Sequence, residues 1–202
     1  MSRKEGQWDI ITAFSSDLHD LNKVRDQLGD SPFVARLLLR SLFSIFDGYS
    51  WYLKQRALEG ATTAKIEFTS DELQIIHEQR VKRLPSGDET VVPMIIQTKE
   101  NLKFAIRAFA RVKHVDPPLV NGALPAEFHA VAEVRNRITH PKSAGDFNIS
   151  KAEANAVGRL LQWFMKVVAW AGEQEQNSIS EARTRMAEMF DEARRNHPPP
   201  NK

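Results

Sequence analysis

The chain has 202 residues, of which 42% are hydrophobic and 27% are charged, a balance that suits one globular domain with a sizeable core. The formal net charge of +2 is only mildly basic, so any affinity for nucleic acid must come from local clusters of cations. The absence of cysteine excludes disulfides, thiolate nucleophiles and cysteine-ligated zinc. No apolar run is long enough for a signal peptide or a membrane span, and we expect a cytoplasmic protein with no membrane partner.

The N-terminal part of the chain predicts two helices. In residues 7–29 the apolar side chains recur every three or four positions, and Gly29 supplies the stop. Ser31 and Pro32 then form an N-cap and a first helical position for a helix that runs to about 58 and has almost no polar side. Such a helix is central or interfacial. Its conspicuous polar residue, Asp47, is expected either to form hydrogen bonds within the core or to orient a basic group such as Arg135.

Residues 60–97 depart from this helical rhythm, and we interpret them as an insertion. Thr69 and Glu72 form a capping box that opens a short helix ending near 81. A turn then separates two runs rich in β-forming residues, which allows a small hairpin with Pro93 restricting the second run to an edge.

Two groups of basic side chains are candidates for contact with RNA, although a solvated loop or face is the default interpretation of each. The first lies at the basic end of the insertion and comprises Arg80, Lys82 and Arg83. The second lines one face of a helix predicted over 98–114 and comprises Lys103, Arg107, Arg111 and His114.

The C-terminal part predicts two further helices. Ser150 and Glu153 form a capping box for a helix over 150–174, expected to pack against the helix that precedes it, and its surplus apolar surface suggests a dimer contact or docking of the last helix. Ser178 and Glu181 are expected to open a separate last helix that ends in a disordered tail. We therefore expect an all-α bundle over 1–175, with the insertion at 60–97, and an accessory helix and tail over 176–202.

The most informative segment is the helix predicted over 124–139. Its apolar residues fall on one sector, and Arg135 lies inside that sector. A guanidinium there needs a carboxylate partner or a cleft. A polar stripe on the other side makes Asn136 and His140 neighbours, and Pro141 ends the helix at or just before His140.

Arg135, Asn136 and His140 resemble the motif of the HEPN family, which is an arginine, a polar residue, three spacers and a histidine in a small helical bundle. The resemblance implies a metal-independent endoribonuclease of toxin–antitoxin or phage-defence systems, in which arginine and histidine meet across a homodimer interface. It also implies RNA as substrate, an antitoxin or effector protein as a candidate partner, and no cofactor or metal.

On this reading Arg135 stabilises the phosphorane and His140 transfers a proton, while Asn136 holds the histidine tautomer or the phosphate. Arg137 and Lys142 are expected to be auxiliary phosphate anchors, together with Lys103, Arg107 and Arg111 on the preceding helix.

Three alternatives remain open on the residues alone. In the first, Arg135 is a structural ion-pair residue and His140 is a helix C-cap. His129, Glu133 and His140 share a face and suggest a metal site, although the strict His-Glu-x-x-His spacing is absent. The chain also fits a non-catalytic dimeric scaffold or a module that binds a ligand or partner.

Overall fold

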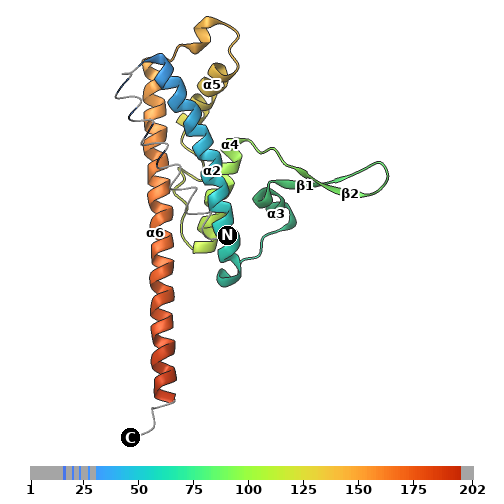
Figure 1. Ribbon diagram of the computed structural model, residues 1–202, viewed down its shortest axis with the longest axis vertical. Coiled ribbons are helices and arrows are strands. Elements are labelled where there is room, and N and C mark those ends of the chain that lie inside the picture. The colour runs from blue at the N-terminus through green and yellow to red at the C-terminus, as the bar shows by residue number, and fades with distance from the viewer. Residues whose placement is uncertain (1–15, 17–19, 21–22, 24–26, 28–30, 197–202) are drawn as a thin grey trace. The chain divides into compact units, whose positions relative to one another are not determined.

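The computed structural model describes residues 16, 20, 23, 27 and 31–196 of the chain. In this part the chain is mainly helical with a single two-stranded sheet, which confirms the expected all-α class with a small hairpin (Figure 1). The named elements are α2 (Pro32–Ala64), α3 (Ser70–His77), β1 (Gln79–Arg83), β2 (Glu89–Pro93), α4 (Thr98–Lys113), α5 (Glu127–Thr139), the 3-10 helix η1 (Ala144–Phe147) and α6 (Lys151–Asn196). Most of the helix expected at 7–29, and the tail from 197 onward, lie outside the described residues.

The chain divides into two compact units, Met1–Gln162 and Trp163–Lys202, and the division falls inside α6. The separate last helix expected from Ser178 is absent, because α6 continues unbroken through that position. Ser178 sits in the helix interior, where its hydroxyl donates a hydrogen bond to the carbonyl of Gln174 at 2.9 Å instead of capping a new N-terminus. Among the described residues no helix is long and apolar enough to cross a membrane.

The central element of the first unit is α2, as its near-continuous apolar character predicted. Ser31 caps it, with the hydroxyl accepting from the amide of Val34 at 3.3 Å, and Pro32 occupies the first turn. The helix continues past 58 to Ala64 and packs along α4. The Val112 side chain of α4 packs directly on Gly60, where an added Cβ would lie 2.6 Å from Cγ1 of Val112.

The insertion forms α3 and a hairpin, and α3 ends at His77 rather than near 81 because the chain turns at Glu78 into β1. The predicted capping box is present: the Thr69 hydroxyl accepts from the amide of Glu72 at 3.3 Å, and the Glu72 carboxylate accepts from the amide of Thr69 at 2.8 Å. Strands β1 and β2 then pair antiparallel, from Gln79 opposite Pro93 to Arg83 opposite Glu89. In Figure 1 the hairpin extends away from the helices, and every residue of β1 is exposed.

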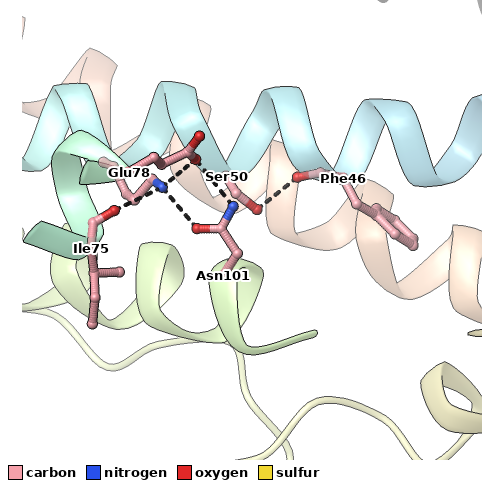
Figure 2. A network of polar contacts seen from close by, with 6 residues as sticks. Phe46, Ser50, Ile75, Glu78 and Asn101 are labelled. Carbon is pink, nitrogen blue, oxygen red and sulfur yellow. Dashed lines mark hydrogen bonds and ion pairs between the residues drawn. The ribbon is translucent and has the colours of Figure 1, made fainter. Parts of the chain in front are cut away.

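A buried lysine joins α2 to the base of this hairpin. The Lys54 side chain is fully buried, and its ammonium donates to the Glu78 carboxylate at 2.6 Å, the Asn101 side-chain oxygen at 2.8 Å and the Ile75 carbonyl at 3.1 Å. Figure 2 shows Ile75, Glu78 and Asn101 converging from α3 and α4 beneath α2. Burial lowers the pKa of Lys54, while the hydrogen bond to Glu78 opposes that change. Three acceptors for three N–H donors satisfy the charged form.

The beginning of α6 lies against α5, as expected. Its capping box is present, with the amide of Ser150 donating to Glu153 at 2.7 Å and the amide of Glu153 donating to the Ser150 hydroxyl at 3.2 Å. Ion pairs Arg137–Glu153 and Arg159–Glu127, both at 2.9 Å, then link α5 to this first part of α6.

Candidate functional site

Helix α5 carries the motif and is held by its apolar face. Phe128, Val131, Val134 and Ile138 are buried, as the predicted sector required. The helix begins at Glu127, three positions later than expected, and in the turn before it the amide of Phe128 donates a hydrogen bond to the Pro125 carbonyl at 3.0 Å. It ends at Thr139 with His140 as the C-cap, which is where Pro141 placed the end.

Arginine side chains of α2 fix the C-terminal end of α5. Arg40 donates to the Ile138 carbonyl at 2.7 Å and so satisfies one of the unpaired carbonyls of the last turn. Arg36 donates to the Phe147 carbonyl at 3.2 Å and lies over the Phe147 ring, 5.2 Å from its centroid. The segment that carries His140 is therefore anchored on both sides by α2.

Arg135 lies at the edge of the core, half-buried, and its partner there is an aromatic ring. The guanidinium carbon is 5.4 Å from the centroid of Phe43, a cation–π distance. One terminal nitrogen also donates to the side-chain oxygen of Asn136 at 3.0 Å. This bond occupies the Asn136 oxygen and leaves the amide NH₂ of Asn136 as a donor.

Asp47 is placed to act on Arg135 electrostatically. The residue as a whole is exposed, but its carboxylate is partly desolvated, and this desolvation raises the pKa of Asp47. A hydrogen bond from Thr98 and the positive charge of Arg135 act in the opposite direction. Asp47 is exposed, so its hydrogen bond with Thr98 is not one within the core, and the orienting of Arg135 by Asp47 stays a prediction.

A pocket of about 440 Å³ opens beside Arg135. Its wall combines α2, α5 and the start of α4, and includes Phe43, Gln97, Thr98, Lys99, Arg135 and Asn136. His129 and Glu133 also line it, and their side chains are 3.5 Å apart. Two side chains of fixed positive charge, Arg135 and Lys99, thus share the pocket with one carboxylate.

His140 does not line this pocket. It is exposed, its amide donates to the Asn136 carbonyl at 2.9 Å, and within the described residues its ring forms no hydrogen bond. One chain therefore brings Arg135 and Asn136 together and leaves His140 outside, at the end of the same helix.

Arg137 has structural partners. It donates to the Asp146 carbonyl at 3.3 Å, the Asn148 carbonyl at 2.7 Å and the Glu153 carboxylate at 2.9 Å. The hydrogen bond with Glu153 raises the pKa of Arg137 further above its already high ordinary value. Contact with a phosphate would compete with these bonds.

Lys142 contributes its backbone to the loop after α5 and leaves its side chain in solvent. The amide of Lys142 donates to the Asp146 carboxylate at 2.6 Å, and the residue is exposed. The Asp146 carboxylate accepts from the amide of Ser143 as well, at 2.9 Å, and these two bonds lower the pKa of Asp146.

The basic stripe on α4 is partly occupied. Arg107 donates to the Gly122 carbonyl at 2.6 Å. Arg111 forms two bonds to Glu72, at 2.8 and 3.2 Å, and stacks over Phe68 with 4.6 Å to the ring centroid. Lys103 is half-buried. Only part of the expected cationic track is open to a ligand without rearrangement.

Lys99, Gln97 and Phe43 are pocket residues that were not predicted from the sequence as site residues. Lys99 was recoverable, because it precedes Lys103 by four positions and extends the α4 stripe by one helical step into the pocket. Gln97 carried a weaker signal, as the residue immediately before the helix. Phe43 carried no sequence signal, since an apolar run does not show which of its aromatic rings lies under a guanidinium.

The pocket is suited to an anionic group. Arg135 can donate two parallel hydrogen bonds to phosphate oxygens, and Lys99 and the Asn136 amide add donors beside it. Comparison with protein-family models, with curated proteins and with solved structures finds no match for this chain.

Proposed function

We propose that the chain is a metal-independent endoribonuclease that acts as a homodimer in the cytoplasm, in a toxin–antitoxin or phage-defence system. The observation that carries the proposal is the placement of Arg135 in a pocket beside Asn136, with His140 exposed at the end of the same helix. The motif resembles that of HEPN ribonucleases in spacing and in its position at a helix end.

The proposed reaction is attack of an RNA 2'-hydroxyl on the adjacent phosphorus. The P–O bond to the 5'-oxygen breaks, one proton leaves the 2'-oxygen and one is delivered to the departing 5'-oxygen. Arg135 stabilises the negative charge of the phosphorane, and the Asn136 amide donates to the phosphate or to His140. His140 transfers a proton. The products are a 2',3'-cyclic phosphate and a 5'-hydroxyl.

A second copy of the chain completes the site in this proposal. His140 is outside the pocket of its own chain, and one histidine cannot serve both as base and as acid on opposite sides of a phosphorus. A two-fold axis beside α5 would bring two arginines and two histidines together.

The decisive test is purified protein incubated with total RNA in the presence of a chelator, beside Arg135→Ala and His140→Ala. Each substitution is expected to reduce cleavage by about 100- to 10,000-fold while the circular dichroism spectrum and the dimer mass stay unchanged. Lys151→Ala is the control, since Lys151 is an exposed residue of α6 that lines neither this pocket nor the hollow beside the hairpin. Full activity of His140→Ala, or 5'-phosphate products that require metal, would refute the mechanism.

Binding measurements separate catalytic roles from anchoring roles. Lys142→Gln is expected to weaken RNA binding and to lower its salt dependence without changing the rate at saturation. Scattering that gives a monomer mass at micromolar concentration would contradict the composite site.

A second candidate function is favoured by the geometry of a single chain. Because the pocket holds Arg135, Lys99 and the Asn136 amide but not His140, it also suits a non-catalytic module that binds an anionic ligand or the acidic group of a partner protein. In that case Arg135→Ala abolishes ligand binding, His140→Ala has no effect, and no RNA is cleaved.

A further inference from the structure

The hairpin formed by β1 and β2 exposes far more of its side chains than a packed element does. Every residue of β1 is exposed, and β2 alternates between exposed and half-buried positions. Val81 and Val91, which lie opposite each other in the ladder, remain 53% and 60% exposed. Two-stranded ribbons with this much free surface are marginal by themselves, so an exposed one calls for a partner.

Strand pairing separates the hairpin cations into two kinds. Arg83 lies opposite Glu89, so an acidic neighbour balances its charge. Arg80 and Lys82 lie opposite Val92 and Thr90, which are neutral. Because they are two positions apart in a strand, Arg80 and Lys82 share one face of the ribbon. Neither forms an ion pair with any described residue.

Arg80 also borders a hollow of about 210 Å³ between the hairpin and α3. The wall of this hollow includes Gln74, His77 and Gln79, whose side chains offer further hydrogen-bonding groups, and Val81 and Val91 supply an apolar part. Arg80 is the hairpin cation that lines this hollow, and its guanidinium beside amide and apolar side chains suits a phosphate with an adjoining base.

The base of the hairpin is fixed, and it leads directly to the α5 pocket. The Glu78 carboxylate is bound by buried Lys54, as Figure 2 shows for the surrounding network, and the Glu78 carbonyl accepts from the amide of Met94 at 2.7 Å. Residues 94–97 then connect β2 to α4, and Ile96 and Gln97 already line the pocket of Arg135. Only four residues thus separate the end of β2 from α4, and two of them belong to the pocket wall.

We propose that β1 is a second RNA-binding element, in which Arg80 and Lys82 contact phosphates of the strand that leaves the Arg135 pocket. The identity of the polyanion as RNA rests on the proposed ribonuclease function. The presence of an anion-binding surface on β1 rests on the charge distribution of the hairpin.

Pairing of the hairpin with a second copy of itself is disfavoured by the same residues. Antiparallel pairing of β1 with β1, centred on Val81, would place Arg80 of each copy opposite Lys82 of the other, and like charges across a ladder destabilise it. Pairing of β2 with β2 would lose a ladder hydrogen bond at Pro93, which has no amide hydrogen. A polyanion neutralises the charge that self-pairing would concentrate.

The test is binding of a fluorescein-labelled single-stranded RNA by fluorescence anisotropy, in a His140→Ala background so that the RNA stays intact. Arg80→Gln/Lys82→Gln is compared with Lys151→Gln/Lys166→Gln, which removes two exposed lysines of α6 and serves as the matched control. The slope of log affinity against log salt is expected to fall by about 1.4 for the hairpin pair, and the affinity at 0.1 M salt by about 20-fold. The control pair is expected to stay within about twofold of the parent.

An RNA affinity of the hairpin variant within twofold of the parent, or equal losses of affinity in both pairs of substitutions, would overturn the assignment of β1. The absence of any RNA binding by the parent would overturn it as well. A cleavage assay on the same substitutions in a chain that retains His140 distinguishes this inference from the proposed function. If the chain binds RNA through Arg80 and Lys82 but never cleaves it, the ribonuclease proposal fails and the hairpin assignment stands. If cleavage occurs and the hairpin pair changes neither KM nor salt dependence, the reverse holds.

Discussion

Removal of the Lys54 charge is the sharpest stability test that the fold offers. Lys54→Met keeps most of the side-chain volume and deletes three hydrogen bonds, to Glu78, Asn101 and Ile75. Breaking a buried ion pair on one side typically costs about 3–5 kcal/mol, because the other charge stays behind without a partner. Here the Glu78 side chain is 39% exposed and regains water, whereas Asn101 is 5% exposed and does not. We therefore expect a loss of about 2–4 kcal/mol in the free energy of unfolding.

Urea denaturation followed by circular dichroism measures this loss. With a slope of about 2 kcal/mol per molar urea, the midpoint is expected to fall by about 1–2 M. Lys142→Met is the control, since Lys142 is an exposed lysine, and it is expected to change the stability by less than about 0.5 kcal/mol. Glu78→Gln combined with Lys54→Met is expected to cost less than the two single substitutions added together. A midpoint shift below about 0.5 M for Lys54→Met, or strict additivity of the pair, would refute the role given to this network.

Two further predictions concern helix packing and acid stability. Gly60→Ala is expected to destabilise the fold by about 1–3 kcal/mol, because the new methyl group would lie 2.6 Å from Val112. Gly158→Ala, with no atom within 4 Å of the new methyl group, is expected to stabilise the fold by about 0.5–1 kcal/mol. Thermal unfolding compares the two variants, and equal effects would contradict the close approach of α2 and α4. The hydrogen bond from Arg137 lowers the pKa of Glu153 below its ordinary 4.5, so this carboxylate stabilises the fold above pH 4.5 and the stabilisation is lost as the pH falls through the lowered pKa. Glu153→Gln should accordingly destabilise at neutral pH and converge with the parent in strong acid, and a difference that persists at pH 2 would argue against this linkage.

Much of the fold could be predicted from local signals. The N-cap at Ser31, the capping boxes at Thr69 and Ser150 and the end of α5 before Pro141 follow from chemistry within four residues, and the structure confirms each of them. The same local signal misled at Ser178, where a serine followed three positions later by a glutamate lies inside a continuous helix. A capping box stabilises a helix start but cannot break a helix that propensity and packing continue.

The site could be predicted only in part, because long-range contacts decide which side chains are available. The position of Arg135 in an apolar sector indicated a cleft or a partner, and the structure supplies both in the pocket and Phe43. No sequence signal indicated the hydrogen bonds of Arg137 to the η1 loop or of Arg111 to Glu72, since these partners lie up to 39 positions away. Lys54 was missed for a related reason: a single lysine in an apolar helix gives no sign of the acceptors that bury it.

The Lys54 network also restricts how the helices can slide. Its acceptors come from positions 21, 24 and 47 residues further along the chain, so the ammonium loses its water only when α2, α3 and α4 have all assembled. The apolar faces of α2 and α4 alone would tolerate a shift by one helical turn, because such faces repeat along each helix. A shift of that size would carry Asn101 away from Lys54 and leave a charge in the core without acceptors. One lysine thus makes the slipped arrangement costly and fixes the longitudinal alignment of the helix pair that carries the pocket wall.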